Sequence, residues 1–256
     1  MPPAPDLRDR ILTRALPAEE NPFAALAASV RWEDVGKGRR GAVLTRVDPE
    51  GGVPLVRTTT RYAAPAQRFR PEHERLAHRI RQLTGSPADF DHALAETYTH
   101  AYATMGAHSD QALDLADGSF IAVYSCYEHP EAGPPRKLVL EGKEPGVEGF
   151  ELPLAHHSVV AFSVDTNRLL RHRIVLDTAG RATENRWLGL TFRTSKTTLR
   201  FHDGHAHLPQ GARLTPADEE QRRAFYRLRR RENQETDFAY PPLTYTVSES
   251  DLMPPV

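Results

Sequence analysis

His108 and Asp110 are two potential metal ligands separated by a single residue. Side chains of an extended strand alternate between its two faces, so these two would point the same way, roughly 7 Å apart along the strand. They could then bind one ion together with a third ligand from a segment that is distant in sequence but adjacent in space. His172 is the best candidate, because it begins the strand-like run HRIVLD. The pattern predicts a metal site made of His108, Asp110 and His172.

An arginine follows this set on another strand-like segment, WLGLTFRTS. One face of that strand would carry Trp187, Gly189, Thr191 and Arg193. An arginine on an inward face needs an anionic partner, because an unpaired buried cation is very costly. Its planar guanidinium suits a carboxylate, to which it donates two hydrogen bonds. Arg193 is therefore expected to bind a carboxylate.

Two histidines and one carboxylate on one side of a metal, with open positions opposite, are the ligand set of non-haem Fe(II) oxygenases. A dicarboxylic 2-oxo acid could bind the iron through its 2-oxo carboxylate end and meet Arg193 with its far carboxylate. The residues thus favour oxidative chemistry at an iron centre.

A rival cluster lies in FHDGHAHLP, residues 201–209. It holds more potential ligands, namely His202, Asp203, His205 and His207. Asp203-Gly204 is typical of a turn, however, and histidines gathered in a loop are usually solvated. We expect the principal metal site to be the other set.

The elements that must position these residues are mainly strands, separated by turn-forming residues. Strand-like runs are expected at 41–47, 54–62, 96–102, 119–127, 136–141, 150–154, 158–164, 172–177, 187–195 and 197–202. So many short strands are typical of a β-sandwich or barrel. The segment TAGRATENR, residues 178–186, is rich in turn formers and connects two of these strands.

Helical patterns flank the strands. They are expected at 6–16, 21–32, 71–84 and 215–233. Asp6 and Asn21 are plausible N-caps, and Gly85 ends the third helix. For the last helix the pattern predicts Thr215 at the N-cap and Pro216 at the first helical position. The tail that follows is expected to be irregular.

Composition argues against several classes of protein. The net charge of −1 does not indicate binding to nucleic acid or to an acidic membrane surface. Cys126 is the single cysteine, so no intrachain disulfide can form and no oxidising compartment is required. The first residues lack the apolar core of a secretion signal, and no apolar run approaches the roughly 20 residues that span a bilayer. We expect a cytoplasmic protein without a membrane segment.

The run RRAFYRLRRREN, residues 222–233, is dense in arginine and could contact phosphates. We favour a solvated helix face paired with nearby acids, because Phe225, Tyr226 and Leu228 supply the apolar contacts that such a helix needs.

Four segments over roughly residues 55–200 carry a family resemblance: RTTTRY (57–62), ETYTHAYATMGAHSD (96–110), SVVAFSVDTNRLLRHRI (158–174) and RWLGLTFRTS (186–195). They resemble the Fe(II)/2-oxoglutarate-dependent dioxygenase superfamily, and within it the AlkB-like branch. The resemblance implies a double-stranded β-helix (jelly roll), mainly β with flanking helices. Because the sequence shows no internal repeat and no low-complexity linker, we expect one domain over residues 1–256, with N-terminal helices in 1–36, a β-helix core at about 40–202, and a C-terminal helix and tail at 215–256.

The resemblance also implies roles for single residues. His108, Asp110 and His172 would be the catalytic iron ligands, and Arg193 would bind the distal carboxylate of 2-oxoglutarate. Two further co-substrate contacts would be Tyr98 and, at an offset one residue longer than in the branch, Arg186. Where the branch has an asparagine, this chain has Glu96.

The implied reaction uses Fe(II), 2-oxoglutarate and O2, releases succinate and CO2, and oxidises a C–H bond of the substrate. We expect a small molecule or a peptide side chain as that substrate, with Tyr98, Tyr124 and Trp187 near the pocket walls. One alternative is oxidative demethylation of N-alkylated nucleic acid, which the branch suggests but the net charge does not favour. The other is a non-catalytic barrel that binds a ligand.

Overall fold

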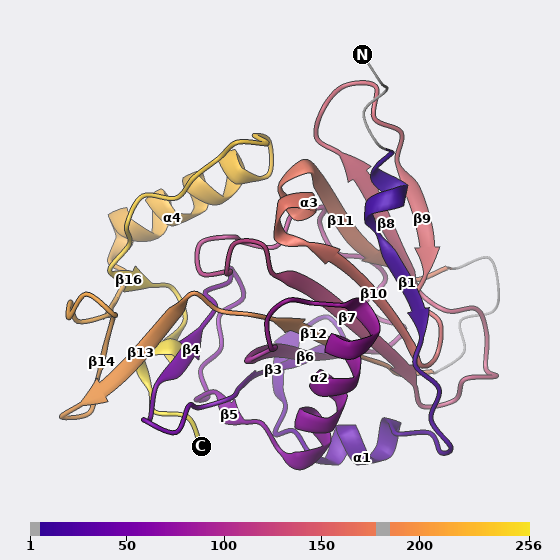
Figure 1. Ribbon diagram of the computed structural model, residues 1–256, viewed down its shortest axis with the longest axis horizontal. Helices are drawn as coiled ribbons and strands as arrows, with labels where there is room; N and C mark the ends of the chain where they lie inside the picture. Colours follow the sequence, from indigo (N-terminus) through magenta and orange to yellow (C-terminus); the bar gives the residue numbers. More distant parts are fainter. Residues whose placement is uncertain (1–5, 178–184) are drawn as a thin grey trace.

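The computed structural model describes residues 6–177 and 185–256. Its centre is an eight-stranded sheet with the order β1-β10-β7-β12-β6-β3-β2, and β5 pairs with β3 beside this path (Figure 1). The strands are β1 (Leu12–Ala15), β2 (Glu33–Gly36), β3 (Arg39–Thr45), β5 (Gln67–Arg68), β6 (His92–Tyr98), β7 (Phe120–Tyr127), β10 (Ser158–Ser163) and β12 (Trp187–Arg193). All neighbours on the path are antiparallel.

A smaller antiparallel sheet has the order β11-β8-β9. Its strands are β8 (Lys137–Gly142), β9 (Phe150–Pro153) and β11 (Leu170–Val175). Two isolated bridges, Thr104 with Val175 and His108 with His172, place the segment 104–108 beside β11. The chain therefore passes back and forth between the large and the small sheet.

Two layers of core follow from strand alternation. Helices α1 (Phe23–Ala28) and α2 (Pro71–Thr84) cover one face of the large sheet, where Leu188, Leu190 and Phe192 of β12 meet them. The other face packs against the small sheet, with Trp187 of β12 beside Leu138 and Leu140 of β8. The face of β12 that the sequence predicts for Trp187 and Arg193 is thus the face toward the small sheet.

The remaining elements lie outside the two sheets. Helix α3 (Val164–Leu169) connects β10 to β11. A three-stranded sheet joins β4 (Val53–Leu55), β13 (Thr197–His202) and β14 (His205–His207). Helix α4 (Glu219–Glu232) lies far from α1 and α2 in Figure 1 and is flanked by the parallel pair β15 (Thr215–Pro216) and β16 (Tyr245–Thr246). Short 3-10 helices occupy η1 (Leu7–Arg10) and η2 (Glu249–Leu252).

The expectation of a mainly β protein with flanking helices is confirmed. Within the described residues the sheets do not close into a barrel, so the double-stranded β-helix stays a prediction. The turn-rich segment at 178–186 falls largely on residues 178–184, outside the described residues. No helix in the described parts of the chain is long and apolar enough to cross a membrane.

The predicted helix at 6–16 is wrong. Asp6 caps only the short η1, and Leu12–Ala15 form β1, which pairs with the edge strand β10. Four residues on that edge form ladder hydrogen bonds with β10 and are stabilised by the sheet, whereas an isolated helix of this length is only marginally stable in water. The strand expected at 54–62 ends at Leu55, and the strand expected at 96–102 runs from His92 to Tyr98 instead.

The predicted start of the last helix is also wrong. Asp218, not Thr215, is the N-cap of α4: its side chain accepts a hydrogen bond from Gln221 N, and the Gln221 side chain accepts one from Asp218 N. This reciprocal capping box satisfies two backbone donors. Thr215 and Pro216 lie in β15. For the helix at 71–84 the prediction is confirmed, since Gly85 ends it with φ of 67°.

Candidate metal centre

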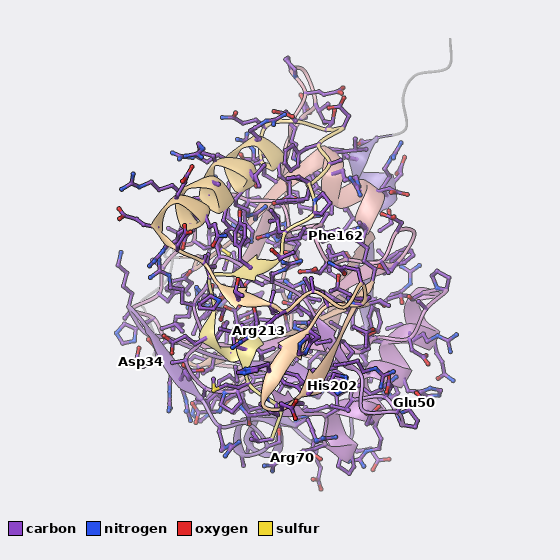
Figure 2. All side chains as sticks on the ribbon, turned by 90° about the vertical axis from the view of Figure 1, so that its left-hand side faces the viewer. Asp34, Glu50, Arg70, Phe162, His202 and Arg213 are labelled. Atoms are coloured by element: carbon purple, nitrogen blue, oxygen red, sulfur yellow. The ribbon has the colours of Figure 1, made fainter. Side chains whose placement is uncertain are left out.

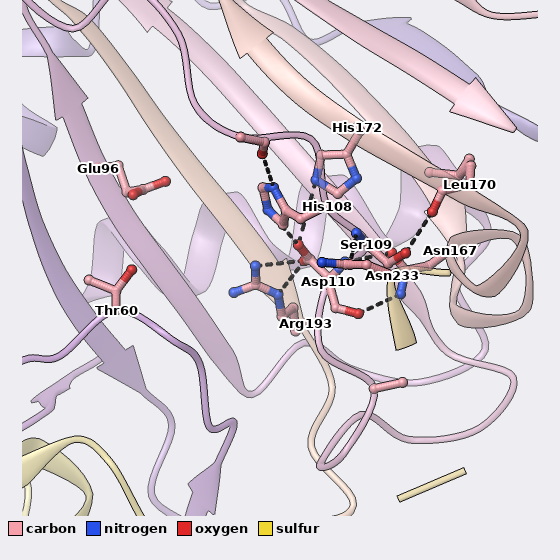
Figure 3. Close-up of polar contacts among 12 residues, drawn as sticks. Thr60, Glu96, His108, Ser109, Asp110, Asn167, Leu170, His172, Arg193 and Asn233 are labelled. Atoms are coloured by element: carbon pink, nitrogen blue, oxygen red, sulfur yellow. Dashed lines mark hydrogen bonds and ion pairs between the residues drawn. The ribbon is translucent and has the colours of Figure 1, made fainter. Parts of the chain in front are cut away.

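His108, Asp110 and His172 each direct one ligand atom toward a common point (Figure 3). These atoms all lie within 4.8 Å of one another. Oδ1 of Asp110 is 3.8 Å from Nε2 of His108 and 3.6 Å from Nε2 of His172. No other group of this kind occurs among residues 6–177 and 185–256. The structure therefore brings together the three residues that the spacing singled out, in an arrangement that can hold a metal ion.

The backbones of the two histidines are hydrogen-bonded to each other. His108 N donates to His172 O at 2.9 Å, and His172 N donates to His108 O at 2.6 Å. The strand pairing ends there: residues 109 and 110 belong to no strand. Ser109 faces away, as strand alternation predicts, and its Oγ donates to Leu170 O at 2.7 Å.

The imidazole of His108 is oriented for metal binding. Its Nδ1 lies 2.9 Å from Gly106 O. Because a carbonyl oxygen can only accept, Nδ1 carries the proton and Nε2 keeps its lone pair for a metal. The ring of His172 packs edge-on against Phe162, with centroids 5.7 Å apart, and this contact restricts its rotation.

Burial and neighbouring charges set the protonation states of the three residues. Burial lowers the pKa of His108 and lowers that of His172 to about 3. Burial alone would raise the pKa of Asp110, but Arg193 and the two histidines hold it well below its usual value. The centre thus presents two neutral imidazoles and a carboxylate, the forms that bind metal, without first releasing protons.

The guanidinium of Arg193 binds Asp110. Its Nε and Nη2 lie 2.7 and 2.6 Å from Oδ2 of the carboxylate, while Oδ1 is the oxygen closest to the histidines. The inward arginine therefore has the anionic partner that its burial requires, and that partner is a protein side chain. Its Nη1 is buried and has no hydrogen-bond partner among the described residues.

His92 gives a pH-dependent prediction for stability. It is opposite Arg193 in the β6–β12 pair, and burial, with a smaller effect of Arg193, lowers its pKa to about 3. Between pH 6.5 and 3 the unfolded chain binds a proton that the folded one does not, so the free energy of unfolding falls as pH falls. The slope is up to roughly 1.4 kcal/mol per pH unit for this residue.

Urea unfolding of the metal-free protein at pH 7, 6 and 5 measures this slope. His92→Gln is expected to flatten it, whereas the matched change at the exposed His78 on α2 is expected to leave it unchanged. Equal slopes in the wild type and His92→Gln would show that His92 binds its proton at the same pH in the folded and the unfolded protein.

Two sets of side chains that the sequence did not predict hold the backbone around Asp110. The first is the amide of Asn167, on α3, which pairs with the Asp110 backbone as another peptide group would. Asp110 N donates to Asn167 Oδ1 at 2.8 Å, and Asn167 Nδ2 donates to Asp110 O at 2.7 Å. The metal ligand is thereby fixed although its backbone has left the sheet.

Helix α4 and the residue after it make a second set of contacts, which we call the α4 clamp: Arg229, Glu232 and Asn233. Ser109 N donates to Asn233 Oδ1 at 3.0 Å, and Arg229 Nη2 donates to Ser109 O. Glu232 accepts from Ala112 N at 2.8 Å and from Arg229 Nη1 at 2.6 Å.

This helix was expected to have a solvated arginine face, and Arg229 is an exception because it is buried. The signal was present in the sequence. Phe225, Arg229 and Glu232 are four and three residues apart, and that spacing places them on one helix face with an apolar anchor.

A cavity of about 390 Å³ opens beside the metal ligands. Its walls include His108, Asp110, His172 and Arg193 at the centre, and also Arg39, Arg57, Thr58–Thr60, Glu96, Tyr102, Gln111 and Arg229. Apolar side chains, among them Val123, Leu138 and Ile174, complete the lining. The cavity can hold a small ligand next to the metal position.

Four residues expected near this pocket do not line it. Tyr98 is fully buried, and its OH donates to Glu96 at 2.8 Å. Arg186 lies away from the centre, where its Nε donates to Glu128 at 2.7 Å and its guanidinium stacks on Phe23. Two others are core residues: Tyr124 packs against the helix-covered face, and Trp187 packs between the sheets.

The rival histidines lie on the β13–β14 hairpin. Figure 2 shows His202 low in the view, well below Phe162, which marks the metal centre. The rings of His202 and His207 are 5.7 Å apart, but within the described chain these residues form no group whose ligand atoms converge.

No protein-family model matches the chain, and no curated protein matches it. Among similar solved structures is one described as "The structure of OsALKBH1". It is 15% identical, with a TM-score of 0.42, over 64% of this chain and 83% of that chain. The assignment of a metal centre therefore rests on the geometry of His108, Asp110 and His172.

Proposed function

We propose that the protein is an Fe(II)-dependent oxygenase that consumes a 2-oxo acid and O2 to oxidise a C–H bond of its substrate. The observation that carries the proposal is the convergence of two imidazoles and one carboxylate beside a cavity. Such a set leaves open positions on the other side of the metal, where ligands can bind.

The residues present fit a divalent iron. His108 and His172 are neutral nitrogen donors, and Asp110 keeps one oxygen for the metal while Arg193 holds the other. Arg193 thus orients the carboxylate as an outer partner of a metal ligand does. Its remaining Nη1 is a cationic donor next to the centre, suited to the carboxylate of a 2-oxo acid.

When bound, the iron and the 2-oxo acid would supply the oxidising power. Overall, the 2-oxo acid loses CO2 and becomes the carboxylate one carbon shorter, one atom of O2 enters that carboxylate, and the other enters the substrate. The chain contributes binding, orientation and exclusion of water by apolar walls such as Val123 and Ile174.

The resemblance names 2-oxoglutarate as the co-substrate, and we propose a small molecule or a peptide side chain as the substrate. Two observations support this choice over nucleic acid. Arg229 of the arginine-rich helix faces inward to Ser109, and Arg223 and Arg231 are paired with Glu219 and Glu235. Demethylation of an alkylated oligonucleotide would overturn the substrate proposal and leave the iron chemistry intact.

Oxygen uptake tests the function. The purified protein is loaded with Fe(II) under argon, and O2 consumption and CO2 release are then measured with 2-oxoglutarate and with monocarboxylic 2-oxo acids. We expect uptake that requires both Fe(II) and a 2-oxo acid. Stoichiometric Fe(II) binding without uptake for any 2-oxo acid would favour the alternative of a non-catalytic ligand-binding protein.

A further inference from the structure

Glu96 places a carboxylate inside the proposed co-substrate cavity. It comes from the middle of β6, and Figure 3 shows its side chain pointing toward the His108–Arg193 group. Only 7% of the residue is exposed. Arg39 Nε donates to Oε1 at 2.7 Å, and Tyr98 OH donates to Oε2 at 2.8 Å. Both oxygens of this carboxylate are therefore bound within the protein.

These are contacts that a dicarboxylic co-substrate would need for its distal end. Tyr98, which the resemblance would assign to 2-oxoglutarate, donates its hydrogen bond to Glu96 instead. Of the two arginines expected to serve the co-substrate, Arg193 binds Asp110 and Arg186 binds Glu128 away from the cavity. The distal carboxylate of 2-oxoglutarate does not fit the residues present.

Every arginine in the cavity lining has an acidic partner. The pairs are Arg39 with Glu96, Arg57 with Asp114, Arg193 with Asp110, and Arg229 with Glu232. No lysine is among the described residues of the lining. The distal carboxylate of a dicarboxylic co-substrate would thus enter the cavity without a cationic partner and would lie beside the carboxylate of Glu96. Placing such a charge in a partly buried site costs free energy.

Glu96 is also held in place by its neighbours. In the sheet it lies between Gly41 of β3 and Gly189 of β12. The space that a side chain would need at these two glycines is filled by Tyr62 and by the ring of Trp187, respectively. Tyr62 and Trp187 therefore occupy the positions next to Glu96 on both neighbouring strands, and they limit the space into which its side chain can move away from Arg39.

We infer that the site takes a 2-oxo acid that lacks a second carboxylate, because Glu96 already supplies that charge from within the protein. This inference rests on the proposed function. The 2-oxo carboxylate end would lie at the metal, near Nη1 of Arg193, and the rest of the co-substrate would be a short neutral chain.

A matched pair of ligands tests the inference. 2-Oxoglutarate and 2-oxopentanoate have the same five-carbon chain and differ only in a distal carboxylate or methyl group. Their dissociation constants are measured by calorimetry on Fe(II)-loaded protein under argon. We expect 2-oxopentanoate to bind roughly 10–100-fold more tightly, because the distal carboxylate of 2-oxoglutarate would lose its water without gaining a cationic partner beside Glu96.

Glu96→Gln is expected to reverse this preference. Glutamine keeps an acceptor for Tyr98 but frees the charge of Arg39, so 2-oxoglutarate should gain affinity by a similar factor while 2-oxopentanoate changes little. Glu128→Gln neutralises an acid paired with the surface Arg186 and is the matched control; it should leave both constants unchanged.

The outcomes separate the inference from the function. Tighter binding of 2-oxoglutarate than of 2-oxopentanoate by the wild type overturns the inference and leaves the proposed function standing. Binding of neither acid by the iron-loaded wild type overturns both. The wild-type comparison decides the question even where Glu96→Gln does not fold.

Discussion

Replacing His172 with alanine is expected to abolish Fe(II) binding at micromolar metal and, with it, oxygen uptake. The change removes one of three protein ligands, and the remaining imidazole and carboxylate cannot cap one side of the ion. The loss should exceed the roughly 10–100-fold cost of removing an outer partner of a metal ligand. His108→Ala and Asp110→Ala should behave in the same way.

The measurement is equilibrium dialysis against Fe(II) under argon, with circular dichroism to verify that each variant is folded. The double variant His205→Ala/His207→Ala is the matched control, because it removes two imidazoles from the hairpin that does not converge on a metal position. If that variant loses the metal while the three others keep it, the metal centre has been assigned to the wrong cluster.

Asn233→Ala is expected to weaken Fe(II) binding by roughly 10–100-fold, although Asn233 does not touch the metal position. Its side chain is the acceptor for Ser109 N, between the two ligands of the 108–110 segment. Without it the backbone there becomes mobile, and holding Asp110 in place costs conformational entropy on metal binding.

The same dialysis measures this effect. Asn233→Asp restores an oxygen acceptor and should recover most of the affinity, which a purely structural defect would not do. Arg230→Ala, on the exposed face of α4, is the control and should bind iron as the wild type does. Equal affinities for Asn233→Ala and Arg230→Ala would show that the α4 clamp has no part in ordering the metal ligands.

The metal ligands could be predicted because their signal is local. A histidine and a carboxylate at i and i+2 share one face of any extended segment, and His172 begins a strand that can lie beside it. The partner of Arg193 could not be predicted in this way. A buried arginine needs an anionic partner, but the sequence does not say whether that partner is Asp110 or a ligand. The answer depends on how β12 lies against the 108–110 segment.

The wrong predictions for the first helix, at 6–16, and for the start of the last helix, at Thr215, have a similar origin. Thr215 and Asp218 are both good N-caps, and the choice between them is made by the pairing of Thr215 with Tyr245, a tertiary contact. Leu12–Ala15 become a strand because β10 offers a free edge, which no local propensity reveals. The α4 clamp was missed because an arginine-dense helix is usually read by its charge and not by its buried face.

The α4 clamp also orders events during synthesis of the protein. Asn233 is made 124 residues after Ser109, and a ribosome that adds about 5–20 residues per second needs roughly 6–25 s for that interval. Throughout it the ligand segment has been synthesised while its clamp does not yet exist. Iron that arrives early meets ligands whose backbone is still unrestrained, so full-affinity loading becomes a step that follows release of the C-terminal helix.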